Sequence, residues 1–517
     1  MSTKEQFIET LNKGYTFKGD SITLGASKLG DEIISEAVVK IPLKTLNRHG
    51  LIAGATGTGK TKSLQVLAEQ LSDNSIPVLL MDIKGDLSGL AAAGEAKDFI
   101  LARTDAAGIA YEPTAYPVEL LSLSEEKGVR LRATVSEFGP ILLGKILGLN
   151  DTQEGIVSAI FKYCDDNGLA LLDLKDFIKV LQYLTDEGKA EFEENYGKMS
   201  TTSLGTIMRK VIELQQQGAD LFFGETSFDV DDLMRIDKNG RGYISVLRVL
   251  DLMDRPKLFS TFMLSLLAEL YAGLPEAGDE DRPKLVIFID EAHLVFQEAS
   301  KALLQQIETV IKLIRSKGVG IYFCTQNPSD VPPAVLSQLG LKVQHALRAF
   351  TASDRRKIKE AADNYPLTDF FDTETVLTSM GIGEALVTAL NEKGIPTPLA
   401  VTYMCPPKSR MDILSDSEID GLINSSKLIP KYNKIVDRES AYEILTVKLE
   451  KAAEEEAKEE AAKSTKSTRG RARQEKSTLE TVLSSSAARQ VGRTAANLLT
   501  RTLLGALGVS TRKKKWF

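Results

Sequence analysis

The densest chemical signal in the chain is a glycine-rich run that ends in a lysine and a threonine. It reads Gly54-Ala55-Thr56-Gly57-Thr58-Gly59-Lys60-Thr61, and Lys62 follows directly. The glycines allow the backbone to wrap so that its N–H groups point inward at phosphate oxygens. Lys60 would neutralise charge on the β- and γ-phosphates, and the Thr61 hydroxyl would ligate Mg²⁺. The spacing therefore predicts a cradle for the triphosphate of ATP together with Mg²⁺.

An acidic pair follows a fully apolar segment much later in the chain. Leu285–Ile289 is apolar, and Asp290 and Glu291 come directly after it. An acid at a strand end beside a phosphate cradle is where Mg²⁺ needs a further protein contact, which we assign to Asp290. Glu291, one residue further along, is then placed to orient and polarise a water molecule. The competing interpretation is a surface pair after a buried strand, and His293 could equally be structural.

A polar amide and two arginines are weaker candidates for the same site. Gln326 follows the apolar run 320–325, where it could sense the γ-phosphate or simply begin the turn before Pro328. Arg315 and Arg348 could stabilise transition-state charge in a neighbouring subunit, as arginines do in related chemistry. Each could as well be an ordinary surface or salt-bridge residue. The loop at Lys84-Gly85-Asp86, after Asp82, is a further place for site residues, although a simple turn would explain it equally well.

These groups can form one site only if the strands that carry them end at the same edge of a sheet. Residues 49–54 read as a strand that enters the glycine-rich loop, 61–72 have helical spacing, and 77–82 form an apolar run typical of a buried parallel strand. Together they predict one strand–helix–strand unit. Further strands are expected at 117–122, 242–247, 284–290, 320–325 and 341–347. The pattern predicts an α/β fold with a mostly parallel central sheet.

Three regions are expected along the chain. Residues 1–48 are expected to form a small β-element, because positions 17–46 alternate apolar and polar residues in short pieces. Residues 49–440 are expected to form the core, with a helical insertion at about 140–235. Residues 441–517 are expected to hold a charged helix at 441–462, a basic linker at 464–477 and an amphipathic helix at 479–509.

Charge is distributed unevenly. The chain has a net charge of −7, yet from Ser464 onward it holds 12 lysines and arginines against two acidic residues. The basic tail could bind nucleic acid, an acidic partner or an anionic membrane surface, or it could be solvated or serve oligomerisation. Three widely spaced cysteines, no signal peptide and no apolar run of 18 residues indicate a cytoplasmic protein. The basic tail adds peripheral attachment at the inner membrane as an alternative.

The motifs together resemble those of the HerA–FtsK superfamily of ring-forming ATPases, and most of all the HerA-like group of bacterial proteins of the YjgR type. The resemblance is carried by residues 51–61, 81–87, 289–293 and 325–329. It implies a RecA-like P-loop NTPase fold, a hexameric ring with ATP at subunit interfaces, and DNA translocation.

Carried over, the resemblance assigns a role to each candidate residue. Lys60 and Thr61 hold phosphate and Mg²⁺, Asp290 completes the metal site, Glu291 is the catalytic carboxylate, Gln326 is the sensor and Arg315 is a candidate finger. The chain departs from HerA proteins in having too few N-terminal residues for their β-barrel, and it shows no winged-helix module.

Three functions follow from these observations. The first is an ATP-hydrolysing ring motor that moves or remodels DNA. The second is an ATP-dependent assembly switch or scaffold that does not translocate. The third is a P-loop kinase, against which Glu291 argues because its place suits activation of water.

Overall fold

The computed structural model describes residues 2–123, 125–249, 255–278, 280–296, 301–434, 436 and 438–466. The chain folds as two compact units. Unit 1 combines Met1–Leu131 with Phe228–Asn433, and unit 2 combines Arg132–Ser227 with the chain from Lys434 onward. The expected basic linker beyond residue 466 and the amphipathic helix at 479–509 lie outside the described residues.

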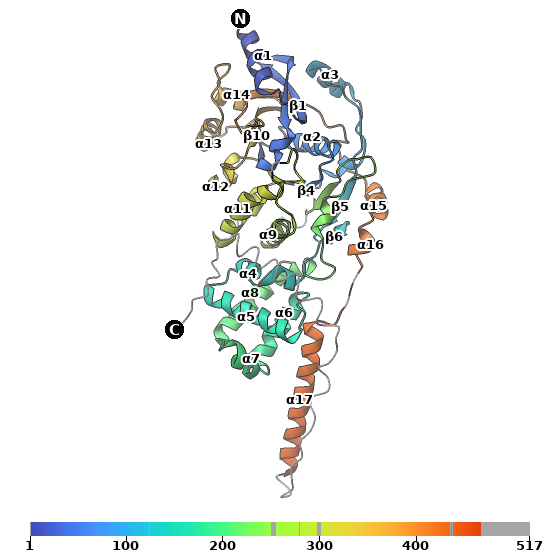
Figure 1. Ribbon diagram of the computed structural model, residues 1–517, viewed down its shortest axis with the longest axis vertical. Helices are drawn as coiled ribbons and strands as arrows, with labels where there is room; N and C mark the ends of the chain where they lie inside the picture. Colours follow the sequence, from blue (N-terminus) through green and yellow to red (C-terminus); the bar gives the residue numbers. More distant parts are fainter. Residues whose placement is uncertain are drawn as a thin grey trace. The chain divides into compact units, whose positions relative to one another are not determined.

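Unit 1 is built on one twelve-stranded sheet (Figure 1). Its strands are β1 (Ser21–Leu29), β2 (Glu32–Pro42), β3 (Gly50–Ala53), β4 (Val78–Asp82), β5 (Val118–Ser122), β6 (Val129–Arg130), β7 (Ile244–Arg248), β8 (Leu285–Ile289), β9 (Val319–Thr325), β10 (Leu341–His345), β11 (Glu384–Thr388) and β12 (Ala400–Met404). They lie in the order β2-β1-β12-β11-β10-β3-β9-β8-β4-β7-β5-β6.

The sheet is parallel from β10 to β6 and antiparallel from β2 to β10. The prediction of an α/β fold with a mostly parallel sheet is therefore confirmed. Every strand expected from an apolar run is present, because continuous apolar residues suit strands that helices cover on both faces. Residues 1–48, which the sequence set apart as a small element, instead supply β1 and β2 to the same sheet, next to β12.

Helices cover both faces of the sheet. Those of unit 1 are α1 (Thr3–Gly14), α2 (Lys60–Asp73), α3 (Asp98–Ala107), α9 (Pro256–Gly273), α10 (His293–Phe296), α11 (Lys301–Ile314), α12 (Pro333–Leu336), α13 (Ala352–Asp363), α14 (Thr373–Ser379), α15 (Asp416–Ser425) and α16 (Ile429–Tyr432). On one face, α1, α2 and α15 bury Phe7, Leu67 and Ile419 with strand residues such as Val78 and Phe288.

The other face is covered by a different set of helices. Phe296 of α10 packs on Phe323 of β9, with ring centroids 5.6 Å apart. Helix α9 contacts both α10 and α11. At the antiparallel end, α13 and α14 bury Ile358 and Leu377 against β11 and β12. Neighbouring residues of a strand point to opposite faces of the sheet, and helices bury both faces.

Unit 2 is helical in its described part. It contains α4 (Val135–Ile146), α5 (Asp151–Asn167), α6 (Leu174–Thr185), α7 (Lys189–Tyr196), α8 (Thr201–Gln216) and α17 (Ala441–Lys466). The insertion expected at about 140–235 begins at Arg132 and ends at Ser227 in this grouping. The charged helix expected at 441–462 is α17, and it packs on α6. The buried carboxylate of Asp176 joins the two by accepting from the N–H of Tyr442 at 2.8 Å and from the hydroxyl of Ser440 at 2.5 Å.

Candidate active site

The glycine-rich loop connects β3 to α2 at the carboxyl edge of the sheet. Gly54, Gly57 and Gly59 have φ angles of 153°, 76° and 114°, which side-chain-bearing residues rarely adopt. At Gly54 a Cβ atom would lie 2.5 Å from the Cβ of His345, so the loop needs glycine there for space as well. Thr58 closes the loop, since its hydroxyl donates to the carbonyl of Ala55 at 2.7 Å.

Lys60 lies inside the loop rather than in solvent. Its ammonium group donates to the carbonyl oxygens of Gly54 at 2.7 Å and Ala55 at 3.2 Å. Burial lowers the pKa of Lys60, and the nearby charge of Lys84 lowers it further, while Glu291 and Asp290 oppose the shift. A buried cation that relies on loop carbonyls can gain stronger, charge-assisted partners from phosphate oxygens.

The next two residues of the cradle differ in their surroundings. Thr61 is half-buried on the first turn of α2. Lys62 directs its ammonium to the carbonyl of Met411 at 2.5 Å and the side chain of Gln65 at 2.8 Å. The Lys62 side chain therefore ties α2 to a neighbouring segment, and only its backbone N–H is left to serve as a cradle donor.

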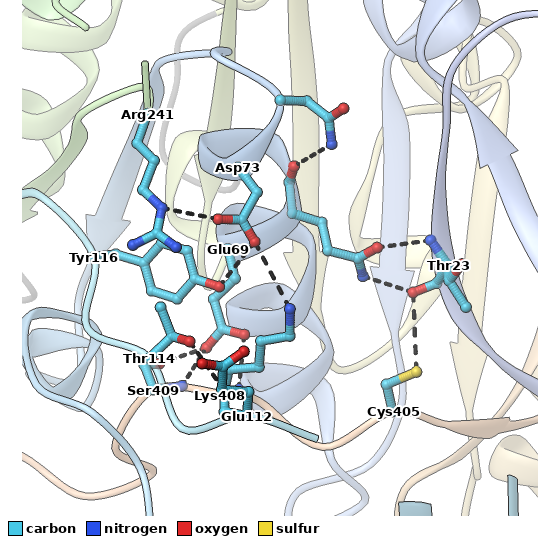
Figure 2. Close-up of polar contacts among 12 residues, drawn as sticks. Thr23, Glu69, Asp73, Glu112, Thr114, Tyr116, Arg241, Cys405, Lys408 and Ser409 are labelled. Carbon is cyan, nitrogen blue, oxygen red and sulfur yellow. Dashed lines mark hydrogen bonds and ion pairs between the residues drawn. The ribbon is translucent and has the colours of Figure 1, made fainter. Parts of the chain in front are cut away.

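That segment, residues 405–415, is here called the strap. It runs beside α2 and is fastened to it at several points, as Figure 2 shows for the end farther from the cradle. The buried carboxylate of Glu69 accepts from the backbone N–H groups of Lys408 at 2.8 Å and Ser409 at 2.9 Å. The hydroxyl of Ser409 donates to the same carboxylate. The strap thus fixes the helix whose first turn carries Lys60 and Thr61.

The acidic pair lies at the same edge as the cradle. In the sheet β9 lies between β3 and β8, and Ile289 pairs with both Phe323 of β9 and Met81 of β4. Asp290 and Glu291 directly follow Ile289 and are both 5% exposed. Glu291 has a φ of 44°, an uncommon conformation for a residue with a side chain. The strand order therefore brings the cradle and the acidic pair to the same edge of the sheet.

Asp290 is held in an environment that suits a cation. Burial raises its pKa to about 6, and the charge of Glu291 adds to this, whereas Lys84 opposes it. Its Oδ2 atom has no hydrogen-bond partner among the described residues, and neither has Oδ1 of Asp86. Buried carboxylate oxygens left without partners are costly unless a cation or donor fills the space, and oxygen is the ligand that Mg²⁺ prefers. The residues present therefore fit Mg²⁺, which Asp290 and the Thr61 hydroxyl would hold.

The loop at residues 84–86, named from the sequence as a further place for site residues, contributes one charged residue to the site. The ammonium of Lys84 lies 2.5 Å from Oε1 of Glu291. Oε2 of Glu291 lies 3.4 Å from Nδ1 of His293. In the sequence, Lys84 and Glu291 each follow an expected buried strand. Only the pairing of β4 with β8 shows that these two strands are neighbours and that the two side chains can meet.

Gln326 and Arg348 also follow strands of the parallel block, at the cradle edge. Gln326 is exposed at the end of β9, next to Thr325, whose hydroxyl donates to Asp330 at 2.6 Å. Arg348 comes just after β10 and donates to the carbonyl of Thr378 at 3.2 Å. Gln326 is therefore available for a ligand, whereas Arg348 caps the end of α14.

Arg315 lies at the opposite edge of the sheet. It precedes β9, whose seven residues span roughly 20 Å. There it lines a cavity of about 340 Å³. The same cavity is also lined by three basic residues and two glutamates, namely Lys44, Arg48, Lys312, Glu280 and Glu392. Burial and then the charge of Arg48 lower the pKa of Arg315. The structure therefore does not bring Arg315 to the cradle of its own chain.

Comparison with known proteins places the chain in a family. The profile of the family described as "Helicase HerA-like C-terminal" matches residues 28–514. The chain belongs to this family. The resemblance of its motifs to the HerA–FtsK superfamily is thereby confirmed.

Curated relatives and solved structures agree with this assignment. The chain is 22% identical to the DNA double-strand break repair helicase HerA of Sulfolobus acidocaldarius over 374 residues, and 22% identical to that of Sulfurisphaera tokodaii over 365 residues. Each match covers 70% of this chain and 66% of the relative, so the chain spans just under two thirds of the relatives' length.

The fold is shared with a plasmid coupling protein. TrwB bound to a non-hydrolysable ATP analogue has a TM-score of 0.51 and 15% identity, covering 78% of this chain and 95% of TrwB. TrwB bound to a non-hydrolysable GTP analogue gives the same TM-score at 14% identity. The RecA-like P-loop fold is therefore confirmed. Among the described residues, no helix is both long and apolar enough to cross a membrane.

Proposed function

We propose that this protein hydrolyses ATP at the carboxyl edge of its sheet. The observation that carries the proposal is that the strand order places the cradle, the buried Asp290 and the buried Glu291 at one edge. The cradle N–H groups and Lys60 would bind the phosphates, and Thr61 and Asp290 would hold Mg²⁺. When bound, Mg²⁺ offsets the charge on the phosphates. Glu291 would orient a water molecule and accept its proton, and Gln326 would contact the γ-phosphate side.

Two variants test this assignment. Lys60→Ala should lose ATP binding in calorimetric titration, because the cradle loses its buried cation. Glu291→Gln should still bind ATP but turn it over at least about 100-fold more slowly, since an amide cannot accept the proton. Lys198→Ala and Glu194→Gln, at exposed positions of unit 2, are matched controls that should behave as wild type. Normal turnover by Glu291→Gln would refute its role.

We further propose that the working form is a homo-oligomer, with a hexamer as the form that family membership favours. Arg315 supports this, because it lies at the edge remote from its own cradle and could complete a site only in another copy. Mass in solution measured with and without a non-hydrolysable ATP analogue tests the assembly. A protein that stays monomeric in both conditions would rule out the ring.

DNA is the proposed substrate of the motor. The support is that the curated relatives are named as DNA repair helicases. The basic tail would add charge contacts with phosphates, although it lies outside the described residues. Double-stranded DNA at low salt should raise ATP turnover, and a chain truncated after Lys466 should respond less. If DNA changes neither turnover nor assembly, the protein is instead an ATP-dependent switch or scaffold.

A further inference from the structure

The ion pair between Lys84 and Glu291 occupies one of the two oxygens of the carboxylate that hydrolysis needs. Lys84 reaches Oε1 of Glu291 at 2.5 Å, so this oxygen already accepts from an ammonium. A carboxylate oxygen engaged in this way is a poor acceptor for a proton from water. The Lys84 side chain is 40% exposed, whereas the Glu291 side chain is 6% exposed. The lysine is therefore the partner that can move.

The loop that carries Lys84 is fixed at its base. The carboxylate of Asp82, at the end of β4, accepts from the backbone N–H groups of Gly85 at 2.8 Å, Asp86 at 3.2 Å and Leu87 at 3.1 Å. This turn leaves the long side chain of Lys84 as the mobile part. The pairing of Met81 with Ile289 keeps the base of the turn beside the strand that carries Glu291.

Lys84 also lies at the cradle edge of the sheet, because it follows β4 and its ammonium contacts Glu291 after the neighbouring strand β8. Its charge lowers the pKa of Lys60, and its own pKa is raised by Glu291 and Asp290 although burial opposes this. One ammonium is thus within electrostatic reach of both the cradle lysine and the two acids. A terminal phosphate brought between these groups would offer Lys84 more negative charge than a single carboxylate does.

We propose that Lys84 is a γ-phosphate contact that holds Glu291 when the cradle is empty or contains ADP, and exchanges Glu291 for the γ-phosphate when ATP is bound. The freed carboxylate then acts on water. The water oxygen bonds to the γ-phosphorus as the bond to the β–γ bridging oxygen breaks, and that electron pair stays on ADP. The water proton passes to Glu291 and then to the released phosphate. This inference rests on the proposed ATP hydrolysis.

Nucleotide affinity, measured without turnover, tests the exchange. Lys84→Met keeps the length of the side chain but removes its charge. Calorimetric titration with Mg²⁺ should show at least tenfold weaker binding of a non-hydrolysable ATP analogue and less than a twofold change for ADP. Glu291→Gln, which weakens the competing partner, should bind the analogue several-fold more tightly. That gain should vanish in the double variant, because it acts through Lys84. Lys198→Met is the matched control.

The outcomes separate the inference from the function on which it rests. If Lys84→Met changes the affinities for ADP and the analogue equally, or changes neither, Lys84 only orients Glu291 and the exchange is refuted. If the wild-type protein binds neither nucleotide, the proposed function itself fails.

Discussion

At the residue scale, Gly54 shows how little space the cradle leaves. A Cβ atom there would meet His345 at 2.5 Å, whereas a Cβ atom at Gly57 would meet nothing within 4 Å. Both residues have positive φ angles, so both substitutions carry backbone strain of about 1 kcal/mol. Only Gly54→Ala adds a collision with the strand end that supports the loop.

We therefore expect the two glycine variants to differ. Gly54→Ala should bind an ATP analogue at least about tenfold more weakly, because one displaced loop amide costs more than 1.4 kcal/mol. Gly57→Ala should lose far less affinity and about 1 kcal/mol of stability. Calorimetric titration and thermal unfolding measure the two effects. Equal affinities for the two variants would contradict this account of the loop.

The core of the candidate site could be predicted from residue types alone. Lys60, Asp290 and Glu291 each follow an apolar strand, and the carboxyl ends of parallel strands meet. The contact between Lys84 and Glu291 could not, because it depends on β4 lying next to β8, and no local pattern states which strands are neighbours. Arg315 illustrates the same limit, since its place at the far edge follows from the strand direction rather than from its own neighbours.

At the element scale, the buried carboxylate of Glu69 is one of the points at which the strap is fastened to α2. Glu69 accepts three hydrogen bonds from Lys408 and Ser409 (Figure 2). Glu69→Ala would leave these donors without partners at a cost of about 3 kcal/mol. Glu69→Gln keeps one acceptor oxygen and should lose about half as much. Denaturant unfolding measures both losses, and limited proteolysis should cut 405–415 faster in the alanine variant. Unchanged proteolysis would mean that the strap is held by its other contacts.

His49 links three elements in its neutral form. Its Nδ1 accepts from the N–H of Ile321 in β9 at 3.0 Å, and its Nε2 contacts the carbonyl of Ile311 in α11 at 2.8 Å. Burial lowers the pKa of His49 to about 4. The folded state therefore keeps His49 neutral, whereas the unfolded chain takes up a proton near pH 6.5. The stability that this residue supplies is complete above pH 6.5 and is lost as the pH falls towards 4.

A pH series should reveal this linkage. Between pH 7 and 5.5, wild type should lose about 1 kcal/mol more unfolding free energy than His49→Gln does, because glutamine cannot take up the proton. Denaturant unfolding at each pH measures the difference. Parallel pH profiles for the two proteins would show that His49 already titrates in the folded state.

The elements could be predicted where their burial leaves a strong local pattern. The parallel strands are continuous apolar runs and were expected. The pair β11 and β12 was not, because these strands contain Thr and Glu and lie at the antiparallel end of the sheet. Likewise β1 and β2 could be recognised as strands, but their joining to β12 is a long-range contact that alternation does not encode.

At the scale of the whole molecule, the two halves of the proposed site are expected on different copies. Lys60→Ala would lack the cradle cation and Arg315→Ala the trans-acting cation, so each protein alone should be inactive. A one-to-one mixture should regain roughly a quarter of wild-type turnover, because only an interface with an intact cradle on one side and an intact arginine on the other can work. ATPase assays of the mixture check this. No recovery in proven mixed oligomers would place the arginine elsewhere.

The pairing of β1 with β12 has a consequence for biosynthesis. Gly25 is synthesised long before its sheet partner Met404, which emerges only after the helical insertion of unit 2 and all of the parallel strands have been made. The hairpin of β1 and β2 must therefore wait without its partner strand until β12 has been made. A nascent chain stalled before residue 400 should expose this hairpin edge to chaperones, and release of β12 should be the step that hides it.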